Sequence, residues 1–93
     1  MKRNLNIARE LLLKLENRED RRGRLYPLDF RIDGYSDEEI DYNAYLLVQD
    51  GFVDGKPSNT PDGMGAFELK AKYMNHLTVS GDIFLASMGN SVL

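Results

Sequence analysis

The 93-residue sequence contains no cysteine and no tryptophan, and His76 is its single histidine. Without cysteine the chain forms no disulfide, and one imidazole is too few for the usual structural zinc sites. Long apolar runs are also scarce: Leu11–Leu13 is far short of the roughly 20 residues of a membrane-spanning helix. The fold therefore depends on an apolar core, and a hydrophobic content of 42% is enough to build one.

The start of the chain lacks the pattern of a secretory signal peptide. Met1–Arg3 is basic, but polar and charged residues follow before any apolar stretch develops. We therefore expect a cytoplasmic protein without membrane attachment. A chain of this length fits one core, so we expect a single domain over residues 1–93, with 89–93 as a frayed tail.

Charge is unevenly distributed along the chain. Residues 1–24 carry eight Lys or Arg against four Asp or Glu, which gives +4. Residues 25–63 carry two against nine, which gives −7, and residues 64–93 balance at two against two. This separation indicates surfaces that contact different partners, or one surface that must repel something. Short charged segments that only keep a small domain in solution would give the same composition.

The clearest element in the sequence is a helix over residues 36–50. Ser36 and Glu39 form a capping-box pattern at its start. At its end, Gly51 followed by Phe52 predicts a Schellman motif, in which glycine takes a left-handed conformation.

Two further segments have the periodicity of amphipathic helices. The first spans about Asn4–Asn17, with Asn4 as its N-cap. The second runs from the cap Thr78 to about Met88, and we expect Gly81 to weaken its first turn. Its apolar side is predicted to consist of Val79, Ile83, Phe84 and Met88.

Three segments predict extended structure. Residues 26–32 alternate between apolar and polar types and predict a short strand. Phe52 and Val53 begin a second strand, and strict alternation over 66–73 predicts a third. Two prolines and two glycines within 55–63 predict a flexible hairpin tip between them. The predicted buried face of the last strand is Phe67, Leu69, Ala71 and Tyr73.

These elements predict an α+β fold of the winged-helix type: three helices, a short strand and a two-stranded antiparallel wing. The helix over 36–50 leads directly into the hairpin, as in winged-helix domains. A ferredoxin-like or other small α+β sandwich is the alternative, but it needs longer strands than residues 26–32 supply.

Several short motifs carry a family resemblance. They are Met1–Asn4, Gly34–Ile40, Leu46–Phe52 and Leu77–Leu85, in that order. Together they resemble a short bacterial and prophage-encoded family, domain of unknown function 2513, over residues 1–88. The resemblance implies a winged-helix-like fold and a phage-related setting, and it supplies no activity. Asn43 and Asp82 stand where the family pattern usually carries histidine, so roles that need those imidazoles do not carry over.

The sequence offers no recognisable catalytic or metal-binding pattern. His76 has Ser80 nearby, but nothing marks an orienting acid or an oxyanion site, so we interpret it as a surface histidine. The carboxylates between Asp37 and Asp41 point in different directions around a helix and cannot converge on one ion. No EF-hand register or phosphate-binding glycine loop is present either. We therefore expect a non-enzymatic protein with no cofactor and no metal.

The helix over 36–50 should read DNA in a winged-helix protein, yet it contains no Lys or Arg. A carboxylate about 6 Å from a phosphate is repelled by roughly 0.7 kcal/mol in water. Tyrosines are enriched at protein-binding hot spots, and acids select basic partners. The outward side of this helix therefore predicts contact with a protein partner or a second copy, unless its tyrosines only pack at the rim of the core. Its residues are Glu38, Asp41, Tyr42, Tyr45 and Gln49.

The second hypothesis is a nucleic-acid surface on the loop over 17–24 and the predicted wing. If these segments lie on one side, their cations could hold a phosphate backbone without sequence specificity, and we expect that binding to be weak. Against it, Glu19 and Asp20 dilute the positive charge of the loop. The cations are Arg18, Arg21, Arg22, Arg24, Lys56, Lys70 and Lys72.

Overall fold

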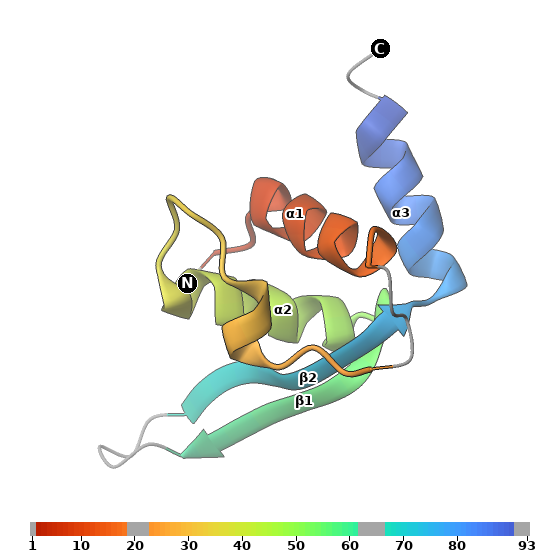
Figure 1. The fold of residues 1–93 in the computed structure, drawn as a ribbon. Helices are drawn as coiled ribbons and strands as arrows, with labels where there is room; N and C mark the ends of the chain where they lie inside the picture. Colours follow the sequence, from red (N-terminus) through yellow and green to blue (C-terminus); the bar gives the residue numbers. More distant parts are fainter. Residues whose placement is uncertain (1, 19–22, 62–66, 91–93) are drawn as a thin grey trace.

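The structure is a computed structural model that describes residues 2–18, 23–61 and 67–90 (Figure 1). The predicted helices and the antiparallel hairpin are confirmed, which makes the fold α+β. Helix α2 lies between α1 and the hairpin, and the far end of α3 extends away from them (Figure 1). Within the described ranges, no helix has the length and apolar composition needed to cross a membrane. The elements are α1 (Leu5–Glu16), the 3₁₀ helix η1 (Pro27–Phe30), α2 (Asp37–Gln49), β1 (Val53–Pro61), β2 (Phe67–Leu77) and α3 (Val79–Asn90).

The first two helices begin at the caps that the sequence predicts. The Asn4 side chain accepts hydrogen bonds from the backbone N–H groups of Asn6 and Ile7, at 2.9 and 3.1 Å. The Ser36 hydroxyl accepts from the N–H of Glu39, whose carboxylate accepts from the N–H of Ser36 in return. Both caps therefore satisfy backbone donors that a helix N-terminus leaves without partners.

The end of α2 is the predicted Schellman motif. Gly51 has a φ of +83°, and the N–H groups of Gly51 and Phe52 donate to the carbonyls of Val48 and Leu47. Thr78 then links this turn to α3, because its hydroxyl donates to the Gly51 carbonyl at 2.6 Å and its N–H donates to the Phe52 carbonyl at 3.1 Å. The same hydroxyl accepts from the N–H of Gly81, as an N-cap does.

Gly81 is needed at the start of α3 for a reason that the sequence does not reveal. A Cβ atom built at this position would lie 1.9 Å from the Phe52 carbonyl oxygen. Helix propensity alone predicts that glycine weakens this turn. The backbone of the α2–β1 connection passes so close that no other residue fits without moving it.

Strand β1 occupies residues that the sequence predicts to be a flexible tip. Residues 53–61 pair with β2, so the loop prediction is wrong for 55–61, and the rest of that prediction lies outside the described residues. Among the described residues β1 pairs with β2 alone, so its other edge needs no backbone donors. Pro57 and Pro61 are therefore tolerated, since proline is compatible with edge strands.

The register of the hairpin shifts twice, because β2 has an extra residue at Asn75 and another at Lys72. A bulge transfers the side chains that follow it to the other face of the sheet. Ala71 and Met74 are consequently both buried, although they are three positions apart. The predicted alternation over 66–73 therefore fails at Tyr73, which is half-buried instead of belonging to the core face.

The strand predicted over 26–32 is wrong. Pro27 opens the 3₁₀ helix η1, and the Asp29 carboxylate accepts the Tyr26 N–H at 2.9 Å. Proline favours a first helical position because its φ is already helical and it has no N–H to satisfy. Only the preceding residue pairs with the sheet: Leu25 exchanges two backbone hydrogen bonds with Met74, at 2.7 and 2.9 Å.

The core side of α3 is predicted only in part. Phe84 and Met88 pack against the core as predicted, together with Leu85. Val79 and Ile83, predicted for the same side, are 77% and 65% exposed. The remaining core comes from α1, η1, α2 and the hairpin, and its members are Ile7, Ala8, Leu11, Leu12, Leu15, Phe30, Ile40, Ala44, Leu47, Val53, Ala71 and Met74.

We predict that Gly81→Ala lowers the free energy of unfolding by about 2 kcal/mol or more, because the new methyl group meets a backbone carbonyl that cannot move alone. Urea denaturation followed by circular dichroism measures this change. Gly23→Ala is the matched control, since no atom lies within 4 Å of its added Cβ. An unchanged or raised stability of Gly81→Ala would contradict the close approach.

Candidate functional site

The outward side of α2 carries the first candidate surface. Ile40, Ala44 and Leu47 face the core, so the opposite side faces solvent. Glu38 and Gln49 are exposed there, and Tyr42 and Tyr45 are half-buried. The structure thus brings together four of the five residues predicted for a protein contact, at positions that share one side of the helix.

The fifth predicted residue, Asp41, lies at the edge of this side and is held by Arg31. Arg31 donates to the Asp41 carboxylate at 2.5 Å, lies 3.2 Å from the carboxylate of Asp37, and donates to the Pro27 carbonyl at 2.7 Å. Burial lowers the pKa of Arg31, but the hydrogen bonds and negative charges of Asp41 and Asp37 raise it above its ordinary value. The guanidinium is therefore always charged, and Asp41 serves first to anchor the segment before α2.

Asn43 is a buried residue that motif analysis of the sequence does not identify as structural. Its side-chain oxygen accepts the N–H of Asn4 at 2.8 Å, and its amide group donates to the Glu39 carbonyl at 2.9 Å. Arg3 and Asp50 form an ion pair at 2.7 Å beside it. The start of α1 is therefore attached to α2 at two points. The sequence signals this role only by placing a polar residue, Asn43, among the apolar positions of the helix.

The second candidate surface lies where residues 23–26 meet β2. The Arg24 guanidinium lies 4.0 Å from the centroid of the Tyr73 ring, and the Tyr26 ring lies 6.2 Å from the same ring in an edge-to-face arrangement. Lys56 is the register partner of Tyr73, and Lys72 is exposed at the neighbouring bulge. The structure therefore places Arg24, at the end of the basic loop, against the hairpin next to the Lys56–Tyr73 pair.

The other cations of the predicted nucleic-acid surface differ in their contacts. Arg18 donates to the backbone carbonyls of Gly23 and Asn75, so it attaches the loop to β2. Lys70 lies opposite Ser58 in the hairpin. Arg21 and Arg22 lie outside the described residues.

His76 lies at the base of the hairpin and is exposed. Its Nε2 atom is 3.5 Å from the Asp54 carboxylate, and its Nδ1 atom is 3.0 Å from the Leu77 carbonyl. Over the part of the chain that the structure describes, no group of three His, Cys, Asp or Glu side chains could hold a metal ion.

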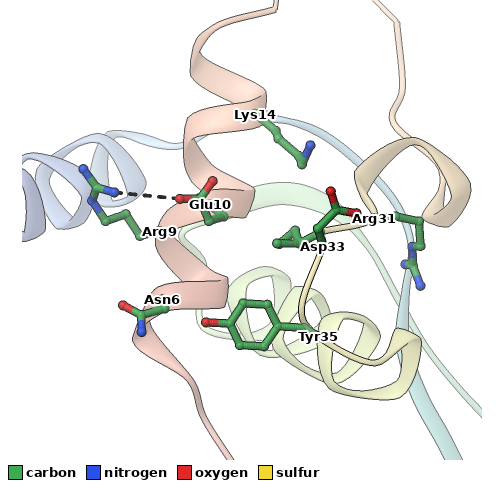
Figure 2. Close-up of a pocket in the computed structure, with 8 residues that line it drawn as sticks. Asn6, Arg9, Glu10, Lys14, Arg31, Asp33 and Tyr35 are labelled. Carbon is green, nitrogen blue, oxygen red and sulfur yellow. Dashed lines mark ion pairs between the residues drawn. The ribbon is translucent and has the colours of Figure 1, made fainter.

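A polar depression of about 520 Å³ lies between α1 and the segment before α2 (Figure 2). Arg9 and Glu10 on α1 lie 3.9 Å apart, and Lys14 and Asp33 point toward one another across it (Figure 2). Because positive and negative side chains alternate around it, this depression selects neither anions nor cations. Its lining residues are Asn6, Arg9, Glu10, Lys14, Arg31, Ile32, Asp33 and Tyr35.

Comparison with known proteins identifies the family. The model of the family described as "Hypothetical protein (DUF2513)" matches residues 2–93. The chain belongs to this family. An uncharacterised protein of Haemophilus influenzae (strain Rd) is 39% identical over 54 residues, which cover 58% of this chain and 44% of that protein. No solved structure matches the chain, so the winged-helix class and the phage setting of this DUF2513 protein remain predictions.

We predict that Arg31→Met lowers the free energy of unfolding by about 1–3 kcal/mol, because it leaves the shielded Asp41 carboxylate without its cation. Thermal denaturation at neutral pH measures the loss. The matched control is Arg3→Met, which removes a more exposed ion pair and should lower the free energy of unfolding by less, about 0–1 kcal/mol. Equal effects of the two substitutions would show that Arg31 is no anchor.

Proposed function

We propose that this protein is a non-enzymatic, winged-helix-like cytoplasmic module of a phage-type bacterial system, and that it binds a protein partner through the outward side of α2. The observation that carries the proposal is the composition of that side. Glu38, Tyr42, Tyr45 and Gln49 share it, and α2 contains no Lys or Arg from Asp37 to Gln49. Such a surface disfavours a phosphate backbone and suits a polypeptide.

The anchoring of Asp41 refines the chemistry of this partner. Burying an isolated carboxylate under a partner costs much free energy, whereas burying one that already has a cation and a hydrogen bond costs less. The Arg31–Asp41 pair therefore makes the edge of the surface easier to bury. Tyr42 and Tyr45 would supply the contact area, and Glu38 would select a partner with a cation opposite it.

We expect the double substitution Tyr42→Ala and Tyr45→Ala to abolish partner binding while the fold persists, because both side chains are only half-buried. A photo-crosslinking amino acid placed at Gln49 should form an adduct with a defined host protein, and the double substitution should remove that adduct. Placement at Leu28, which is 89% exposed on η1, is the control and should give no such adduct. The same adduct with and without the tyrosines would refute this role of α2.

A second candidate function is nucleic-acid binding through the hairpin, and the contact between Arg24 and Tyr73 favours it. Arg24 lies over that ring, Lys56 is the register partner of Tyr73, and Lys72 is its neighbour in β2, so three segments of the chain bring cations to this part of the hairpin. Three cations can hold a phosphate backbone without reading bases, but few contacts give low affinity at physiological salt.

We predict weak, sequence-independent binding of duplex DNA, detectable by fluorescence anisotropy at low salt and lost near 0.15 M salt, where the Debye length is about 8 Å. Arg24→Ala combined with Lys72→Ala should weaken it and reduce its salt dependence, whereas Arg3→Ala, which removes the cation paired with Asp50, should not. Sub-micromolar, sequence-selective binding at about 0.15 M salt would reverse the order of the two proposals.

A further inference from the structure

The hairpin has an outer face that α2 does not cover. Ala71 and Met74 of β2 are buried in the core, and the bulge between them leaves Lys72 and Tyr73 outside it. Lys56 is the register partner of Tyr73, and residues directly opposite in an antiparallel pair point to the same face. The outer face of the hairpin therefore carries an aromatic ring beside two exposed lysines.

Residues 24–26 run beside β2 and widen this face (Figure 1). Leu25 pairs with β2 and packs against the core, so its two neighbours point to the outer face, because successive side chains of an extended chain alternate. The contacts agree with this alternation. The Arg24 guanidinium lies 4.0 Å from the centroid of the Tyr73 ring, and the Tyr26 ring lies 6.2 Å from it, edge to face.

The cations of this outer face are not neutralised by carboxylates. Among the described residues, Arg24, Lys56 and Lys72 form no ion pair. Their charge is therefore available to an anionic ligand. The Asp29 carboxylate accepts the Tyr26 N–H at the η1 end of the face, where it would repel a phosphate. An anionic chain would accordingly follow the hairpin and not η1.

The aromatic rings distinguish nucleic acid from other anions. Tyr26 is 49% exposed although its ring contacts Tyr73. The faces of unpaired bases stack on tyrosine rings and on the planes of arginine guanidinium groups, whereas carboxylates and lipid phosphates have no such plane. A duplex keeps its bases inside the stack. Only an unpaired strand can therefore use both the rings and the cations of this face.

We propose that the outer face of the hairpin binds single-stranded nucleic acid. One base would stack on Tyr26, and another on the Arg24 guanidinium where it covers the Tyr73 ring. The two lysines would hold the phosphates. The residues of the site are Arg24, Tyr26, Lys56, Lys72 and Tyr73.

This inference rests on the second candidate function, nucleic-acid binding through the hairpin, and names an unpaired strand as its preferred ligand. It is independent of the protein contact proposed for α2, because the two surfaces share no residue.

Fluorescence anisotropy at low salt tests the proposal with three labelled probes: a strand of about 10 deoxythymidines, the same strand paired as a duplex, and an abasic strand of equal length. The deoxythymidine strand should bind about tenfold or more tightly than the other two probes. The abasic strand has the same phosphates without bases. A purely electrostatic surface would instead favour the duplex, which carries more charge per unit length.

Substitution of Tyr26 tests the stacking contact. Tyr26→Ala should weaken binding of the deoxythymidine strand about tenfold, whereas Tyr26→Phe keeps the ring and should retain most of the preference for an unpaired strand. Ile83→Ala, which truncates an exposed apolar side chain on α3, is the control. Because the chain has no tryptophan, its tyrosine emission can be observed directly, and the deoxythymidine strand should quench it less in Tyr26→Phe.

The possible failures are distinguishable. If the duplex or the abasic strand binds as tightly as the deoxythymidine strand, the inference is overturned and the second candidate function stands. Unchanged single-strand binding by Tyr26→Ala would also overturn it. If none of the three probes binds at low salt, both the inference and the second candidate function are wrong.

Discussion

The end of α2 and the beginning of α3 share their backbone hydrogen bonds, and the remaining elements are arranged around this junction. Thr78 donates to the carbonyls of Gly51 and Phe52, while Gly81 passes too close to Phe52 to carry a side chain. Strand β1 leaves this junction and strand β2 returns to it. The direction of α3, and with it the side of α3 that stays uncovered, therefore follows from a backbone contact more than from the apolar pattern of the helix.

Polar attachments hold in place the segments that bear opposite charges. Asn43 and Arg3 attach the start of α1 to α2, and Arg31 attaches the segment before α2 to Asp41. Arg18 and the Leu25–Met74 pair attach the basic loop to β2. The uneven charge of the sequence thereby becomes an α2 that contributes no cation of its own and a hairpin side with several. The fold keeps them apart because each segment is held by partners far away in the chain.

Features set by neighbouring residues could be predicted from the sequence. The caps Asn4 and Ser36 and the left-handed Gly51 depend on contacts within a few positions, so reading the residue types was sufficient. Features set by distant residues could not. The bulge at Lys72 displaces Tyr73 from the core, and nothing within 66–73 signals it. Asp41 is part of the predicted side of α2, but its cation lies ten residues earlier, across a turn.

By itself the sequence determined the family, the three helices, the hairpin and the composition of the α2 surface, because periodicity and capping act over one or two turns. The tertiary structure alone decided that residues 27–30 coil beside the sheet, that Arg24 lies on the hairpin, and that Val79 and Ile83 face solvent. Each of these outcomes depends on which distant segment packs against a position, and a local pattern of apolar residues cannot encode that.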